Sequence, residues 1–283
     1  MDIQISESAP YKALFVSFLS FFVPLIPIVY FIVIKKIDKF SVIMMLIGAF
    51  IFVLFALVLE RLLHLLVFYL FPQLKNTIWS LCAYGAFMAG LFEETGRLLA
   101  FIFLKNNEKY NNNNLNSIFY GIGHGGIEVY LLVTLQYFVN FIYCKKAINK
   151  TLDQKQLDTI YNQLILLSNS SYSFMLYVVY ERIVALNYHI CASVIVWIGV
   201  MKNKIYLYFI AILLHFSLDF SIGVSLEFKY YSKIKSLIYI IFSDWTILTL
   251  IIAIILWIKY IDNESKKLNA NESITFNIHG NDI

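Results

Sequence analysis

Charged residues are scarce in this chain of 283 amino acids. Asp, Glu, Lys and Arg make up only 14% of it, whereas 60% of its residues are hydrophobic. A soluble domain ordinarily has about 25% charged and about 45–50% apolar residues, so the composition excludes an ordinary soluble protein. The net charge of +4 is small and scattered over connecting segments, and we therefore expect no nucleic-acid partner.

Cysteine patterns and the motifs of several enzyme classes are also missing. The three cysteines, Cys82, Cys144 and Cys191, have no C-x-x-C spacing, which argues against a disulfide framework and against a thiolate metal site. The chain has no H-E-x-x-H, no G-x-S-x-G, no phosphate-binding loop and no G-x-G-x-x-G that follows a strand. These absences leave no soluble-enzyme signature to follow.

Long apolar runs are what the sequence has in abundance. A hydrocarbon core of about 30 Å needs about 20 apolar residues in a helix, and runs of this length recur along the chain. We predict an all-α, polytopic bundle of about seven spans, with six to eight compatible with the pattern, forming one integral domain over residues 1–283 in a bacterial plasma membrane. The predicted spans are 11–34, 41–70, 78–104, 117–143, 172–200, 203–223 and 235–259, followed by a polar tail over 262–283.

Two features of the connecting segments stand out. Between residues 145 and 171, the apolar residues Leu157, Ile160, Tyr161 and Leu164 follow the i, i+3, i+4, i+7 spacing of a helix, so we expect an amphipathic helix on the membrane interface. Lysines are divided almost evenly between the two sides of the predicted bundle, and they leave its orientation undecided.

Acids, histidines and arginines inside the apolar runs are the most informative feature. A charge at the centre of a bilayer costs roughly 2.5–3.5 kcal/mol on insertion scales and is rare there without a partner or a function. Four such groups occur in different predicted spans, and we expect them to form one buried site. They are Glu93-Glu94-x-x-Arg97, His124-x-x-x-Glu128, Glu181-Arg182 with His189, and His215-x-x-x-Asp219.

The first group has two acids and one base on one helix face. Glu93 and Arg97 are four residues apart and Glu94 and Arg97 are three apart, so both pairs are neighbours in a helix. One arginine holds one carboxylate as a charge-assisted pair. The other carboxylate is then available as a general base or a metal ligand, unless the three form only a structural ion pair.

The second group has a histidine among glycines. Gly121, Gly123, Gly125 and Gly126 surround His124, and Glu128 lies one turn further on. Small residues let membrane helices approach closely, and they would equally leave room for a substrate backbone. Glu128 would orient the imidazole, or both side chains would bind one ion.

The remaining groups lie in the last three spans. Arg182 and His189 are two turns apart and share a stripe, and we expect Glu181 and Arg182 to support His189. His215 and Asp219 repeat the one-turn spacing of His124 and Glu128.

Four weaker candidates lie elsewhere. We expect Glu60, Arg61 and His64 near the interface, where long side chains reach water. Asp244, in the last predicted span, has no assigned partner.

Taken in order, the four groups resemble the YhfC family of intramembrane metalloproteases, over roughly residues 41–260. That family is related to the CAAX-protease and bacteriocin-processing group and to the PrsW-type proteases. CAAX-type enzymes usually have three residues between the two glutamates and the arginine. Here only Thr95 and Gly96 intervene, so we infer no prenylated substrate.

The resemblance implies peptide-bond hydrolysis in the membrane, with a membrane protein or peptide as substrate. Glu93 or Glu94 would activate a water molecule. His124, His189 and His215 would hold a divalent metal, with zinc the first choice, or would stabilise the oxyanion directly. Arg97 would assist the glutamates, and Glu128 and Asp219 would orient the histidines or act as ligands.

Three other functions remain compatible with the same residues. Intramembrane acids and histidines also build proton relays, so a proton- or ion-coupled transporter is one alternative. Histidines on facing helices can ligate haem. A protease-like protein without activity, acting in immunity or as a scaffold, would keep the same fold.

Overall fold

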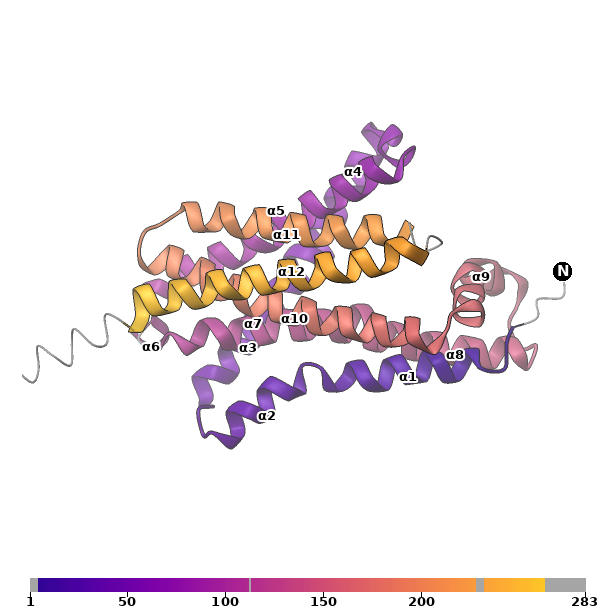
Figure 1. Ribbon diagram of the computed structural model, residues 1–283, viewed down its shortest axis with the longest axis horizontal. Coiled ribbons are helices and arrows are strands. Elements are labelled where there is room, and N and C mark those ends of the chain that lie inside the picture. Colours follow the sequence, from indigo (N-terminus) through magenta and orange to yellow (C-terminus); the bar gives the residue numbers. More distant parts are fainter. Residues whose placement is uncertain (1–4, 112, 228–231, 263–283) are drawn as a thin grey trace, which may run out of the picture.

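A computed structural model describes residues 5–111, 113–227 and 232–262, while the side chains of residues 111, 225–227, 232–244 and 262 lie outside the description. All regular secondary structure in these ranges is helical (Figure 1). The all-α prediction is confirmed. The side chain of Asp244 and the predicted tail beyond residue 262 lie outside the described part of the structure.

The helices follow one another with short connections, and several predicted spans consist of more than one element. The elements are α1 Ala9–Phe22, α2 Leu25–Val33, α3 Lys39–Phe52, the π-helix η1 Val53–Leu59, α4 Glu60–Leu70, the 3₁₀-helix η2 Pro72–Lys75, α5 Ile78–Lys105, α6 Glu108–Asn111, α7 Leu115–Glu128, the π-helix η3 Val129–Thr134, α8 Leu135–Ile148, α9 Gln154–Asn169, α10 Tyr172–Met201, α11 Tyr206–Glu227, α12 Ser232–Trp257 and the π-helix η5 Ile258–Asp262.

Local chemistry explains several of these boundaries. Pro24 has no backbone N–H to donate and separates α1 from α2. Asp38 caps α3, because its carboxylate accepts hydrogen bonds from the Ser41 backbone N–H and hydroxyl. The same bonds hold the pKa of the Asp38 carboxyl below its usual value.

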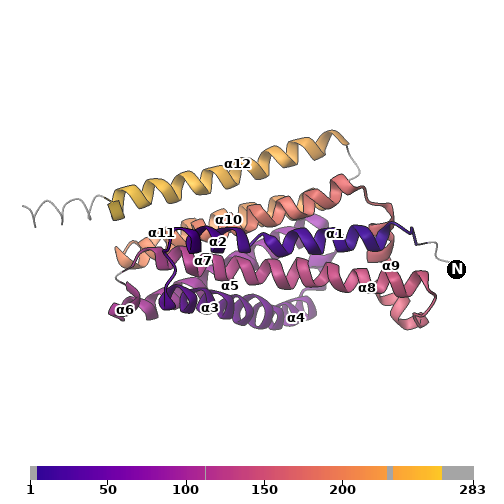
Figure 2. The same ribbon diagram turned by 90° about the horizontal axis from the view of Figure 1, so that it is seen from below.

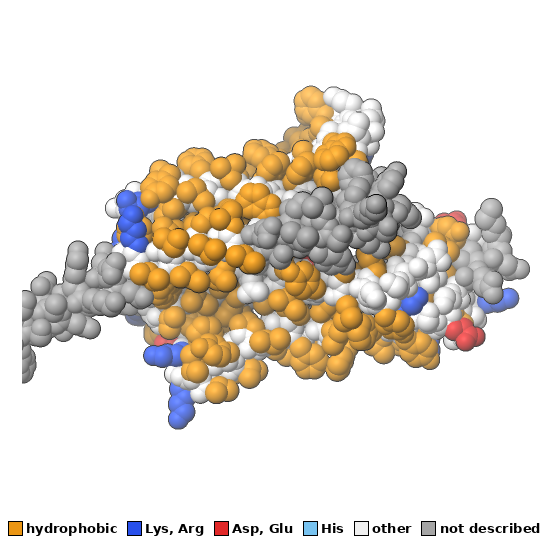
Figure 3. Space-filling model, viewed as in Figure 1, with side chains coloured by type: hydrophobic (Ala, Val, Ile, Leu, Met, Phe, Trp, Pro, Cys, Tyr) orange, Lys and Arg blue, Asp and Glu red, His pale blue; other side chains and the backbone are white. Residues whose placement is uncertain are grey.

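Five helical stretches in the described ranges are long and apolar enough to cross a membrane, and the chain is a multi-pass membrane protein. They are Ala9–Val33, Lys39–Leu70, Leu115–Ile148, Tyr172–Met201 and Tyr206–Val224, and Trp245–Ile261 is a shorter apolar helix. α5 has 28 residues and is therefore long enough for the span predicted over residues 78–104. It is less apolar than the five stretches because it carries Glu93, Glu94 and Arg97. Figure 3 shows hydrophobic side chains over the middle of one face and lysines or arginines toward its ends.

α10 occupies the centre of the bundle. It packs on α7 on one side and on α5, α11 and α12 on others, and Figure 2 shows α12 running along its outer side. Accordingly, most of its C-terminal half is buried. α4 behaves differently, because it points away from the other helices (Figure 1) and exposes Leu62, Leu65 and Leu66.

α9 is the amphipathic helix that the sequence predicts between residues 145 and 171. It buries Ile160, Leu164 and Leu167 against α1 and α8. The buried Lys12 of α1 donates to the Leu167 carbonyl at the end of α9 at 3.2 Å. The helix is confirmed, and its place on the membrane interface stays a prediction.

The glycines of α7 bring neighbouring helices into backbone contact. A Cβ on Gly123 would lie 1.9 Å from the Met45 carbonyl oxygen of α3, and a Cβ on Gly48 would lie 2.2 Å from the Tyr120 carbonyl oxygen of α7. On the other face, a Cβ on Gly121 would lie 2.6 Å from the Ile190 Cα of α10. The glycines therefore serve helix packing, and the idea that they leave room for a substrate backbone was wrong for Gly121 and Gly123.

Replacing Gly123 with alanine should destabilise the bundle by about 1–3 kcal/mol or more, because the new methyl group must push α3 away from α7. Gly85→Ala is the matched control, since a Cβ there meets no atom within 4 Å. Thermal unfolding of both variants in one detergent measures the difference. Equal melting temperatures would show that the α3–α7 crossing is not tightly packed.

Candidate metal and hydrolytic site

One buried ion pair organises the α5 part of the site. Arg97 donates to Glu94 Oε2, and both side chains are inaccessible to solvent. Glu94 Oε1 also accepts from His215 Nδ1 at 3.0 Å and lies 3.3 Å from the Tyr188 hydroxyl. With these contacts, both oxygens of Glu94 are occupied by partners from α5, α10 and α11.

Glu93 has a different environment from its neighbour. Its Oε2 accepts from His124 Nε2 at 2.9 Å and lies 3.9 Å from His189 Nδ1. Glu93 also lines a cavity, whereas Glu94 does not. Of the two glutamates that the sequence leaves equivalent, Glu93 is therefore the one that faces open space.

His189 is fixed from both of its ring nitrogens. Its Nε2 lies 2.5 Å from Glu128 Oε2, and its Nδ1 lies 3.1 Å from Arg97 Nη2. Arginine has only donors, so Nδ1 accepts and Nε2 carries the proton that faces the carboxylate. Glu128 is held in turn by Arg182 at 2.8 Å, and Arg182 also binds Glu181. Glu181 and Arg182 therefore support His189 indirectly, because Arg182 contacts Glu128 and Glu128 contacts His189.

His215 lies between two carboxylates. Its Nδ1 donates to Glu94, and its Nε2 lies 3.5 Å from Asp219 Oδ2. The imidazole is buried, but 33% of the Asp219 side chain is exposed, and Asp219 lines the same cavity as Glu93. Asp219 is thus the acid beside His215 that water can reach.

Three of these side chains form a group with the chemistry of a metal site. Glu93, His189 and His215 each offer one ligand atom, and these atoms lie within 4.8 Å of one another. All three residues are buried. Two imidazoles and one carboxylate are a donor set that catalytic zinc sites use, with one position left for water.

His124 is outside that group, although the sequence makes it one of three histidine ligands. Its ring packs 4.8 Å from the His189 ring, centre to centre, and its Nε2 is bonded to Glu93. Its Nδ1 is buried without a hydrogen-bond partner among the described residues. The structure therefore brings together all ten residues of the four groups, with Glu93, and not His124, beside His189 and His215 in the group of possible ligands.

A cavity of about 510 Å³ connects the site with α4. Its walls include Glu93, Glu128, Arg182 and Asp219 at the site, and Glu60, Arg61 and His64 further along. Glu60 is buried, its Oε1 accepts from His64 Nε2 at 3.0 Å, and the Tyr84 hydroxyl donates to His64 Nδ1 at 2.8 Å. The expectation that all three residues at 60, 61 and 64 reach water was wrong for Glu60.

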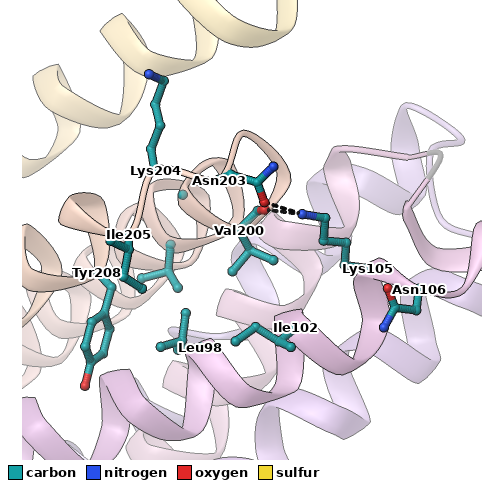
Figure 4. Close-up of a pocket in the computed structure, with 11 residues that line it drawn as sticks. Leu98, Ile102, Lys105, Asn106, Val200, Asn203, Lys204, Ile205 and Tyr208 are labelled. Carbon is teal, nitrogen blue, oxygen red and sulfur yellow. Dashed lines mark hydrogen bonds between the residues drawn. The ribbon is translucent and has the colours of Figure 1, made fainter.

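A second cavity, of about 410 Å³, lies near the other end of α5 (Figure 4). Lys105 reaches across it and donates to the Val200 carbonyl at 2.9 Å and to Asn203 Oδ1 at 2.8 Å. No acid or histidine is among the described residues that line it. Its lining therefore offers no general base or carboxylate ligand for hydrolysis.

Tyr188 was not recognised in the sequence, and Glu60 was considered only as a residue expected near the interface. Tyr188 donates to the Ala211 carbonyl at 2.9 Å and faces Glu94, but a tyrosine in an apolar span carries no distinguishing signal. The sequence does contain a signal for Glu60. This residue follows Lys39, the first residue of its helical run, by 21 positions and is therefore far from that end of the helix.

Removing the charge of Arg97 should cost about 3–5 kcal/mol, because Arg97→Met leaves the buried Glu94 carboxylate without its counter-charge. The double variant Arg97→Met, Glu94→Gln should recover part of this loss. Unfolding in detergent of wild type, both single variants and the double variant gives the coupling energy. A double variant as unstable as the sum of the single variants would show that the pair is not coupled.

Residues 21–241 match the family model described as YhfC intramembrane metalloprotease. The chain is 31% identical over 180 residues to the uncharacterized membrane protein YhfC of Bacillus subtilis (strain 168), which covers 60% of this chain and 67% of that protein. No solved structure matches.

Proposed function

Because the chain belongs to the YhfC intramembrane metalloprotease family, we propose that it is an endopeptidase that cleaves a membrane-associated protein or peptide at the cavity beside Glu93. Family membership gives a metalloprotease and a protein substrate. The observation that carries the finer proposal is the convergence of Glu93, His189 and His215, of which Glu93 lines that cavity.

Glu93, His189 and His215 would hold the divalent cation, with zinc as the first choice for two imidazoles and one carboxylate. When bound, the cation supplies Lewis acidity and lowers the pKa of a water molecule. The buried position supports this assignment, since the ion-pair partners of Glu93 in the described ranges are histidines, and a cation would balance the charge of the buried carboxylate. His124 would orient Glu93 through the 2.9 Å hydrogen bond.

Asp219 would act as the general base. It is partly exposed, lines the cavity and lies one turn from His215. Its carboxylate would accept a proton as the water oxygen bonds to the peptide carbonyl carbon, and would return this proton to the amide nitrogen as the C–N bond breaks. Atoms and charge balance without a further reactant.

The other charged residues would position this set. Glu94 holds His215, Arg97 holds Glu94 and His189, and Arg182 holds Glu128 against His189. Because Arg97 uses the lone pair of His189 Nδ1, the contact between Arg97 and His189 would have to yield when a cation takes that nitrogen, whereas the other contacts would stay. They support a rigid shell in which the imidazoles keep one orientation.

The test is the metal content of purified protein together with hydrolysis of a membrane-protein substrate in the same preparations. Wild type should contain about one divalent cation per chain, and His215→Ala should lose both the cation and the hydrolysis. Equal, negligible metal in both proteins would remove the metal from the proposal.

A further inference from the structure

The cavity beside Glu93 extends well beyond the proposed metal ligands. One wall is formed by η1 and α4, including Ala56 and Leu57. The opposite wall comes from α5 and α11, including Leu81, Ala89 and Ile222. A chain segment placed between these apolar walls would reach Glu93 at one end without leaving the cavity.

The acids that line this cavity are all paired. Glu60 is bonded to His64 at 3.0 Å, Glu128 to Arg182 at 2.8 Å, and Glu93 to His124 at 2.9 Å. Asp219 lies 3.5 Å from His215. Each of these acids therefore already has a basic side chain of the protein beside it.

Arg61 is the exception among the charged residues of the cavity. It is exposed and lines the cavity, and it makes no ion pair or hydrogen bond with another residue in the described ranges. Arginine is always charged, and its planar guanidinium binds a carboxylate with two parallel hydrogen bonds. The cavity thus presents one cation that lacks an anion.

The position of Arg61 along α4 decides which anion fits. Leu62 to Leu70 separate it from the end of the helix, and at about 1.5 Å per residue they span about 14 Å. Leu62, Leu65 and Tyr69 in this stretch are exposed and apolar, so they are suited to lipid chains. With the end of α4 at the membrane surface, a lipid phosphate there would lie well away from Arg61, whereas a substrate in the cavity would be adjacent to it.

We propose that the cavity between α4 and α5 is the substrate-binding cleft, that it holds an extended polypeptide segment, and that Arg61 binds an acidic side chain of this segment. The inference rests on the proposed function, because the cleft ends at the residues assigned to hydrolysis. It adds a preference of the enzyme for substrates with a carboxylate near the scissile bond. Arg61 is then a specificity residue, and it takes no part in bond cleavage.

Cys82 provides a reporter for the cleft. It lines the same cavity and is partly exposed, while Cys144 and Cys191 are buried. Alkylation by a small maleimide, measured by mass spectrometry of the intact protein, should occur first at Cys82. Cys82→Ser confirms the assignment of the signal.

The experiment compares two sets of apolar heptapeptides as protectants of Cys82 in detergent-purified full-length protein. In one set a single glutamate occupies each position in turn, and in the other set glutamine replaces it. For the best position, the glutamate peptide should protect wild type at about tenfold lower concentration, as expected for a charge-assisted pair. Arg61→Gln should abolish this preference and Arg61→Lys should keep part of it. Lys75→Gln, outside the cavity, should leave it unchanged.

Three results would overturn the proposal. The first is equal protection of wild type by both peptide sets, and the second is a glutamate preference that survives in Arg61→Gln. The third is protection by phosphatidylglycerol nanodiscs without protection by any peptide, because that result would assign Arg61 to lipid phosphate. Wild type and Arg61→Gln share the proposed metal ligands, so a peptide carboxylate that bound a metal would contribute equally to both proteins, and the difference between them reports on Arg61 alone. Failure of the metal assignment would therefore leave the protection assay unaffected, and the two proposals fail separately.

Discussion

Glu93→Gln should lose the bound divalent cation and lower peptide hydrolysis by at least about 10³-fold. Glutamine keeps the size of the side chain but offers a neutral amide oxygen in place of a carboxylate, so a cation between Glu93, His189 and His215 loses its only anionic ligand. The loss in rate follows because a bound divalent cation lowers the pKa of water to about 7, and this effect is lost with the cation. Metal analysis and hydrolysis are measured on one preparation.

Glu60→Gln is the matched control for this variant. Glu60 is also a buried glutamate that lines the cavity, but it is bonded to His64 and lies outside the proposed ligand group. It should keep a full complement of metal. If Glu93→Gln retained its metal and lost only hydrolysis, Glu93 would be the general base and not a ligand.

Asp219→Asn should keep the metal and lower kcat by about 10²–10⁴-fold, the usual range for the loss of a general base. The imidazole should stay in place, because its Nδ1 still donates to Glu94. KM should change little, because the substrate does not depend on this carboxylate for binding. Steady-state kinetics and metal content together check the prediction.

Asp219→Glu tests whether the position tolerates a longer carboxylate, and it should recover part of the activity that asparagine loses. Wild-type kcat in Asp219→Asn would contradict the assignment. If Glu93→Gln also retained its metal, the two assignments would be exchanged, with Glu93 as the general base and Asp219 as the metal ligand. The two variants therefore distinguish the two roles.

Much of the site was predictable because the bilayer makes buried charge costly. Glu93, His124, His189 and His215 lie in four different helices, and hydrophobic surroundings alone single them out. The same physical argument predicts that they converge, and the hydrogen bonds between them agree. Their catalytic roles remain proposals.

Other features were beyond the reach of a single sequence. Glu93 and Glu94 are adjacent and chemically identical, so only their partners distinguish them: Arg97, His215 and Tyr188 surround Glu94, while Glu93 faces the cavity. Likewise, the glycine-rich stretch around His124 was compatible with helix packing or with substrate access. The backbone of α3 lies so close to Gly123 that packing is the answer.

The sequence by itself determined an all-helical membrane protein with ionisable residues that need one another, because hydrophobic length and the cost of buried charge are properties of the residues and of the lipid. Tertiary structure alone decided which carboxylate meets which histidine and that Glu60 and Arg61 line the same cavity. It also decided that Glu93 takes the place expected for His124 beside His189 and His215. Those outcomes depend on the rotation and spacing of packed helices, and these are set by contacts between residues far apart in the chain.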